Sequence, residues 1–143
     1  MSIVEALRAA RESRDYSRLG EAMPYMDALG IQVEEAAGGV LLVLAADSIH
    51  VGNPFTQALH GGFIGAFLET AAIVQLILEQ DGDTLPKPIN ITVDYLRGGR
   101  VVATRAAARV TKLGRRVANV HASCWQDDPE RPVATLSGHF LMS

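Results

Sequence analysis

A single long apolar run dominates the hydropathy pattern of the chain. It covers residues 61–78 and carries one carboxylate, Glu69, near its middle. The length of the run and the stop signal Asp81-Gly82-Asp83 behind it predict one helix from Gly61 to about Gln80. The run is at the lower limit for crossing a membrane, and a carboxylate would be costly there. We therefore expect the buried core helix of a globular domain.

On both sides of this helix, apolar and polar residues alternate with the period of a β-strand. Before the helix, residues 28–36 and 40–46 are predicted strands, and the Gly38-Gly39 pair between them is typical of a hairpin. Residues 47–58 are predicted to form a loop. After the helix we predict a meander of four strands, at residues 89–95, 100–113, 115–126 and 133–142.

One apolar helix flanked by strands predicts an α+β domain, in which an antiparallel sheet of about five to six strands curls around the helix. A parallel α/β sheet needs helices between successive strands, and the pattern has none. The first residues follow helical spacing, which predicts a short surface helix with apolar positions at Ile3, Val4, Leu7 and Ala10. We expect a single domain, with a helical extension at residues 1–27 and the core at residues 28–143.

The composition narrows the possible functions. The chain has 143 residues, of which 48% are hydrophobic and 20% charged, as in ordinary globular proteins. Its net charge of −3, without a basic tract, gives no reason to expect nucleic-acid binding. The only cysteine, Cys124, rules out an intrachain disulfide and suits a reducing cytoplasm. The N-terminus lacks the apolar core of a signal peptide. His50, His121 and His139 share no ligand spacing, so we expect no metal site.

Glu69 is the first candidate for chemistry. Its neighbours on the helical face are all apolar or small: Gly62, Gly65, Ala66, Ala72, Ile73 and Leu76. A carboxylate in such surroundings is costly to desolvate, and ionisable groups held there are often functional. Two other interpretations stay open, namely a helix less buried than expected and an ion pair with an arginine across an interface.

The segment His60-Gly61-Gly62 is the second candidate, because it opens the same helix. Two glycines let a ligand approach the first-turn N–H groups, which have no partner within the helix. Together with the positive end of the helix dipole, these groups can polarise a carbonyl and stabilise an oxyanion. The alternative interpretation is a tight entry into the helix with a solvent-exposed histidine.

The spacing between the two candidates bears on subunit structure. Eight residues separate Gly61 from Glu69, which is about 12 Å along an α-helix. One chain therefore cannot bring both groups to one carbonyl. If they act together, one of them belongs to a second subunit, and the active site is dimeric.

Four motifs follow one another along the chain: Asn53-Pro54, Leu59-His60-Gly61-Gly62, Glu69 in the apolar helix, and Asp94-Tyr95-Leu96-Arg97 on the next strand. From about Ile31 to Met142, this ordered set resembles the hotdog-fold acyl-CoA thioesterases of the PaaI-like group. The resemblance implies a hotdog fold, a homodimer or dimer of dimers with sites between subunits, and acyl-CoA as substrate, with no metal and no further cofactor.

The resemblance also implies roles for individual residues. Glu69 is the general base or the nucleophile, and the Gly61 N–H, aided by Gly62, polarises the thioester carbonyl. Asn53 and His60 orient the attacking water or the thioester. A thioester is already reactive, so a positioned water, a base and an oxyanion donor suffice for its hydrolysis.

Two further sets of residues are candidates for substrate binding. Pro88 stands where many family members have Ser or Thr, and Thr92 or Asn90 is expected to replace it. Arginines at strand ends or turns are expected to contact the phosphates of coenzyme A, with ordinary surface charge as the alternative: Arg97, Arg100, Arg115 and Arg116.

The expected function is therefore hydrolysis of an acyl-CoA to a carboxylic acid and free CoA by a cytoplasmic enzyme. A hotdog protein that binds acyl-CoA without turnover is the main alternative. A hydratase or dehydratase of acyl thioesters is the other, although the usual local signatures of those enzymes are absent.

Overall fold

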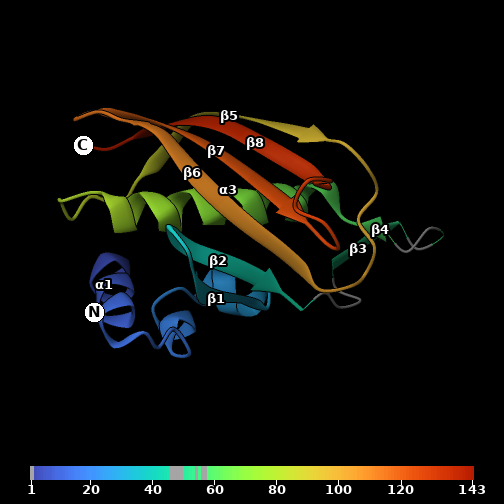
Figure 1. Ribbon diagram of the computed structural model, residues 1–143, viewed down its shortest axis with the longest axis horizontal. Coiled ribbons are helices and arrows are strands. Elements are labelled where there is room, and N and C mark those ends of the chain that lie inside the picture. The colour runs from blue at the N-terminus through green and yellow to red at the C-terminus, as the bar shows by residue number, and fades with distance from the viewer. Residues whose placement is uncertain (1, 46–49, 54, 56–57) are drawn as a thin grey trace.

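The computed structural model describes residues 2–45, 50–53, 55 and 58–143, except for the side chains of Val51 and Asn53. A six-stranded antiparallel sheet in the order β1-β2-β6-β7-β8-β5 curls around the long helix α3 (Gly61–Glu79) (Figure 1). The strands are β1 (Ile31–Ala36), β2 (Gly39–Leu44), β5 (Lys87–Tyr95), β6 (Thr104–Leu113), β7 (Val117–Trp125) and β8 (Ala134–Leu141). The predicted α+β hotdog architecture is confirmed.

The predicted four-strand meander is wrong in one respect, because β5 does not pair with the strand that follows it. It pairs instead with β8, so that it forms an outer edge of the sheet. β5 also begins at Lys87 and includes Pro88, which an edge strand tolerates because its outer N–H groups need no partner in the sheet. Alternation along a segment identifies it as a strand, but it does not show which other strands pair with it.

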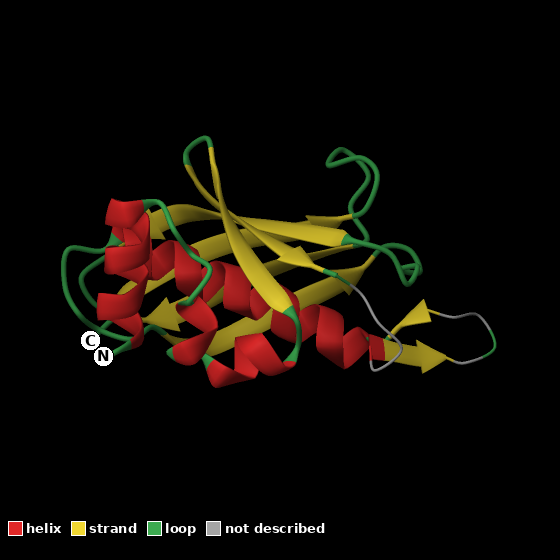
Figure 2. Cartoon of the chain, turned by 90° about the horizontal axis from the view of Figure 1, so that it is seen from below, coloured by secondary structure: helices red, strands yellow, loops and turns green. Residues whose placement is uncertain are grey.

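The helical extension contains more than the single helix expected. α1 (Ile3–Ser13) starts with a capping box between Ser2 and Glu5, and it is followed by η1 (Leu19–Glu21) and α2 (Pro24–Ala28). The first strand therefore starts at Ile31 and not at residue 28, because Pro24 begins a helix that runs to Ala28. Figure 2 shows these helices gathered at one end of the molecule together with both termini.

The segment expected to be a loop before α3 includes a small two-stranded ribbon. β3 (Val51–Asn53) pairs with β4 (Ala58–Leu59), and the ribbon projects from the end of the molecule opposite the N-terminal helices (Figure 2). The N–H of His60 donates to the carbonyl of His50 at 2.7 Å, and the N–H of Leu59 to that of Gly99 at 2.9 Å. These bonds tie the start of α3 to its surroundings.

The hydrophobic core lies between α3 and the concave face of the sheet. By length and composition α3 would suffice to cross a membrane, with a mean hydropathy of 1.7, but 56% of that window is buried inside the fold. This is the pattern of a core helix, as the sequence predicts. The largest fully buried side chains include Phe67, Leu68, Leu76, Ile77, Leu136 and Phe140.

Cys124 lies in this core, and burial raises the pKa of its thiol from 9.0 to about 11. In the unfolded chain the thiol ionises near its ordinary pKa, while the folded protein keeps the proton. The free energy of unfolding is therefore unaffected below about pH 9 and falls by about 3 kcal/mol at most as the pH rises to about 11.

Urea unfolding across this pH range measures the effect, with Cys124→Ala as the control that lacks this contribution. We also expect the native protein to resist a disulfide-exchange reagent at about pH 8, and the unfolded protein to react. Rapid labelling of the native protein would contradict the burial of this thiol.

Candidate active site

The first turn of α3 is capped by the side chain of the preceding histidine. His60 has extended backbone angles (φ −65°, ψ 131°), and its Nδ1 accepts a hydrogen bond from the Gly62 N–H at 3.0 Å. An imidazole that accepts at Nδ1 is neutral and carries its proton on Nε2. The Gly62 amide is thus already engaged within the chain, which leaves the Gly61 amide as the candidate oxyanion donor.

Gly61 occupies the first helical position and is half-buried. Among the residues that the structure describes, none accepts a hydrogen bond from its N–H. Its carbonyl oxygen accepts one from the Tyr95 hydroxyl at 2.7 Å. This N–H, at the positive end of the helix, is therefore available for the donor role that remains a prediction.

Glu69 lies on a partly exposed stripe of α3 and not in the core. Gly62, Gly65 and Ala66 share this stripe and are exposed or half-exposed, whereas the opposite face of the helix is buried. Within the described part of the chain, the Glu69 carboxylate has neither a hydrogen bond nor an ion pair. The stripe is therefore a surface on which a carboxylate is available to a substrate.

The residues of β5 divide between the two faces of the sheet according to their partners on β8. Val93 and Tyr95 pair with the buried Leu136 and Ala134, so they point toward the helix. Thr92, one residue away, points to the outer face. The structure therefore does not bring Thr92 to the side of the sheet on which Glu69 lies.

Asn90 lies on the same outer face of β5 as Thr92, and its Oδ1 is 2.8 Å from Nδ1 of His139. Neither replacement expected for the Ser or Thr of the family thus meets Glu69 within one chain. Alternation alone shows which residues of a strand share a face. It does not show which of the two faces meets the helix.

The four candidate arginines fall into two groups at opposite ends of the sheet. Arg97 and Arg100 follow β5 at the end where α3 begins, beside a cavity of about 240 Å³ that Arg131 also lines. Arg115 and Arg116 lie in the β6–β7 turn, where the Arg116 carbonyl accepts from the Met142 N–H at 2.7 Å. One chain does not bring the two groups together.

Within the first group, both arginines already have partners. Nε of Arg97 donates to the Pro132 carbonyl at 2.9 Å, and the guanidinium of Arg100 forms an ion pair with Asp127. The positive charge at this end of the sheet is therefore partly compensated within the chain.

The backbone of Asn53 belongs to β3 and pairs with Ala58, next to the start of α3. A Cβ on the neighbouring Gly52 would lie 2.7 Å from the Cα of His60, so only glycine allows β3 to approach so closely. The ribbon thus holds residue 53 near the His60 end of α3. The side chain on which its predicted role depends is outside the described residues.

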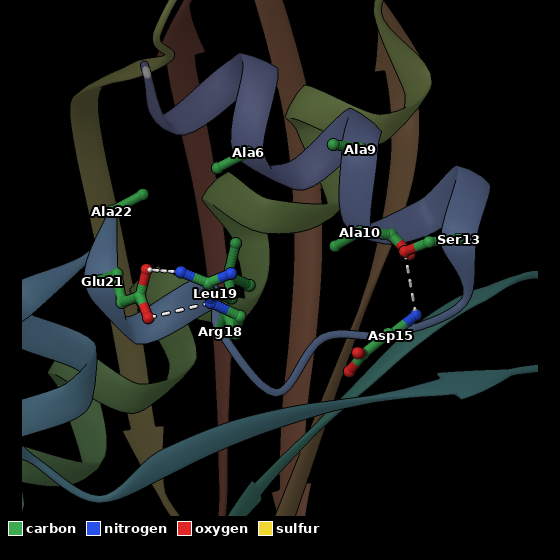
Figure 3. Close-up of a pocket in the computed structure, with 9 residues that line it drawn as sticks. All are labelled: Ala6, Ala9, Ala10, Ser13, Asp15, Arg18, Leu19, Glu21 and Ala22. Carbon is green, nitrogen blue, oxygen red and sulfur yellow. Dashed lines mark hydrogen bonds and ion pairs between the residues drawn. The ribbon is translucent and has the colours of Figure 1, made fainter.

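A larger cavity lies elsewhere. It measures about 580 Å³ and is formed between α1 and η1 at the N-terminal end of the molecule, with the Arg18–Glu21 ion pair on its wall (Figure 3). Three small side chains of α1 line it: Ala6, Ala9 and Ala10. Nothing in this cavity combines a free carboxylate with a free helix amide, so we place the candidate site at the start of α3.

The sequence of the chain decides its family. The profile of the acyl-CoA thioesterase N-terminal domain family matches residues 51–141, which contain every candidate site residue named above. The chain belongs to this thioesterase family. Membership of this family makes the protein a thioester hydrolase. The ordered motifs that resemble the PaaI-like group correctly indicated the family. A search of curated protein sequences gave no match.

Solved structures share the fold of the chain. A crystal structure of a Chromobacterium violaceum protein is 34% identical to the thioesterase, covers 97% of each chain and superposes with a TM-score of 0.79. A phenylacetic acid degradation-related protein of Ralstonia eutropha is 23% identical, over 87% of this chain and 97% of that one, with a TM-score of 0.74.

A Bacillus halodurans protein whose structure contains CoA is 22% identical to the thioesterase, over 99% of this chain and 88% of that one, with a TM-score of 0.72. At this level of identity the likeness concerns the fold alone. The fold that surrounds α3 in the thioesterase is thus one that elsewhere accommodates CoA.

Proposed function

We propose that the chain hydrolyses an acyl-CoA to a carboxylic acid and free CoA, in the cytoplasm, at a site shared by two copies. Gly61 of one protomer donates its N–H to the thioester oxygen, and Glu69 of the partner subunit activates the attacking water. The observation that carries the proposal is the free Glu69 carboxylate on the half-exposed stripe of the helix that begins with the free Gly61 amide.

The edge strand β5 supports the proposal that a second copy contributes to the site. Among the described strands, none pairs with its outer side, and three of its large side chains are exposed: Ile89 (53%), Ile91 (37%) and Tyr95 (54%). An uncovered strand edge beside an apolar face is a surface for pairing. A two-fold axis beside the outer edge of β5 pairs the strand antiparallel with its own copy, joins the two sheets and lets the second α3 cover the apolar face.

The position of the axis follows from the chemistry. Glu69 of one helix meets Gly61 of an antiparallel partner helix only if the axis passes midway between them, at the level of Gly65. A Cβ on Gly65 would lie 4.0 Å from Cγ2 of Val93, so the axis meets β5 near Val93. The absence of a side chain at Gly65 lets the two helices approach closely at their crossing.

The same axis would bring the two groups of arginines together at one end of the joined sheet. Antiparallel pairing of β5 places the Lys87 end of one strand beside the Tyr95 end of the other. Arg115 and Arg116 of one protomer then lie at the end of the joined sheet that holds Arg97 of its partner. We propose that both groups contact the phosphates of one CoA, with Arg97 next to the thioester-binding end.

Hydrolysis in this site needs two proton movements and no cofactor. Glu69 takes a proton from water as the oxygen attacks the carbonyl carbon, and the charge on the carbonyl oxygen is stabilised by the Gly61 N–H. Collapse of the tetrahedral intermediate breaks the C–S bond, and the CoA thiolate takes up a proton. If Glu69 attacks the carbon itself, water cleaves the resulting anhydride in a second step. His60 caps the first turn of α3, and His60 and Asn53 orient the attacking water or the thioester.

Subunit complementation tests the shared site. Glu69→Gln and Gly61→Pro each inactivate both sites of a homodimer, but a heterodimer of the two variants retains one site with an intact Gly61 and an intact Glu69. Refolding equal amounts together should restore about a quarter of wild-type activity, since half of the dimers are mixed and each has one working site.

Refolding the wild type with the double variant is the matched control. Its heterodimers contain no intact site, so activity should fall to the quarter that wild-type homodimers supply, whereas sites within single chains would leave about half. Activity that does not return in the mixture of single variants would contradict the shared site. Analysis of the products with a panel of acyl-CoAs separates the alternatives. Binding without CoA release would favour the binding protein, and a hydrated acyl-CoA product would favour the hydratase.

A further inference from the structure

The peptide group that joins Gly61 to Gly62 is held by a side chain at each end. Its carbonyl oxygen, which belongs to Gly61, accepts a hydrogen bond from the Tyr95 hydroxyl at 2.7 Å. Its N–H, which belongs to Gly62, donates to Nδ1 of His60 at 3.0 Å. The two side chains come from separate parts of the chain, since Tyr95 ends β5 and His60 precedes α3.

This peptide group needs external support. Each glycine in a helix is less favourable than alanine by about 1 kcal/mol, because it loses more conformational freedom when it is fixed. Neither Gly61 nor Gly62 has a side chain that packs against its surroundings. A helix that begins with two glycines is therefore prone to fray in the turn whose free N–H faces the candidate site.

The Tyr95 ring adds a packing contact to the hydrogen bond. A Cβ on Gly61 would lie 3.4 Å from Cε1 of the ring, and one on Gly65 would lie 3.6 Å from the hydroxyl oxygen. The ring thus rests on the glycine side of α3. Tyr95 is 54% exposed, so burial in the core does not account for a tyrosine at this position.

We propose that Tyr95 is a positioning residue for catalysis. Through its hydroxyl it fixes the Gly61–Gly62 peptide, and thereby the direction of the Gly61 N–H toward the thioester oxygen. The inference rests on the proposed role of this N–H as oxyanion donor. A donor that turns away from the developing charge stabilises the transition state less, while substrate binding is little changed.

Tyr95→Phe tests the hydroxyl, because it keeps the ring. Loss of one orienting hydrogen bond should lower kcat about five- to tenfold and change KM less than about twofold. Tyr25→Phe is the matched control, since Tyr25 is also an exposed tyrosine but lies in α2. Unchanged kcat in Tyr95→Phe would overturn the proposal.

A double-mutant cycle asks whether Tyr95 acts through the amide. In the Gly61→Pro background the N–H is already absent, so adding Tyr95→Phe should lower kcat no further. If the two losses multiply, Tyr95 acts independently of the amide and the proposal is wrong.

Amide hydrogen exchange keeps the test independent of turnover. With 15N-glycine labelling, the Gly62 amide should exchange faster in Tyr95→Phe than in the wild type, and Gly30, at another turn, should not change. Equal exchange at Gly62 would overturn the proposal whatever the kinetics. If the wild type hydrolyses no acyl-CoA, the proposed function fails, and the exchange experiment still decides whether Tyr95 holds the first turn.

Discussion

Replacing Glu69 with glutamine is expected to lower kcat for acyl-CoA hydrolysis by about 10³-fold, within the range for loss of a general base. Glutamine has the shape of glutamate but cannot take the proton from water. Because the Glu69 carboxylate makes no hydrogen bond or ion pair in the described part of the chain, we expect the free energy of unfolding to change by less than about 0.5 kcal/mol. Substrate binding should also persist.

Release of CoA, followed with a thiol reagent, measures this loss, and calorimetric binding of acyl-CoA to the variant measures what remains. Glu79→Gln is the matched control, since Glu79 is an exposed carboxylate at the far end of the same helix. If Glu69→Gln retains more than about a tenth of wild-type kcat, Glu69 is neither base nor nucleophile.

Single turnover in 18O-labelled water distinguishes the two roles of Glu69. A general base delivers the labelled oxygen to the first product molecule. A nucleophile delivers its own unlabelled oxygen first and acquires the label when water attacks the glutamyl carbon of the anhydride.

Replacing Gly61 with proline is expected to lower kcat by about 10²- to 10³-fold, as for the loss of one oxyanion donor. Proline has no backbone N–H, the group under test, and is well tolerated at the first position of a helix. The preceding His60 has the extended backbone that a residue before proline requires (φ −65°, ψ 131°). The substitution therefore removes the donor and leaves the helix in place.

Gly61→Ala is the control for the added bulk. It keeps the N–H, and its Cβ would make ordinary van der Waals contact with the Tyr95 ring at 3.4 Å. We expect Gly61→Ala to retain most of the wild-type kcat and Gly61→Pro to lose it, while both melt close to the wild-type temperature. Equal activity in the two variants would exclude the Gly61 N–H as the donor.

Several elements of the fold follow from local patterns. The α3 helix could be predicted because an apolar run of that length, closed by Asp81-Gly82-Asp83, has few other solutions in a domain of this size. The strands could be recognised by their alternation. The ribbon of β3 and β4 was missed, because strands of three and two residues leave almost no periodic signal.

The candidate site could be proposed from the sequence where its residues are neighbours along one helix. Gly61 and Glu69 could be chosen from residue type and spacing alone. The sequence did not show that Thr92 points to the outer face of the sheet, and it did not identify Tyr95 as a partner of Gly61. Both depend on which face of β5 meets α3, and the pairing of β5 with β8 decides that.

By itself, the sequence determined the long helix, the strands of the main sheet, the α+β class, the family, and the separation of about 12 Å that makes a one-chain site with Gly61 and Glu69 impossible. These properties depend on residue type and spacing, which are local. Only the tertiary structure decided that β5 is an uncovered edge, that the Gly62 amide is taken by His60, and that Tyr95 reaches the Gly61 carbonyl. Such contacts join residues as many as 34 positions apart, and their formation depends on how the whole sheet closes around the helix.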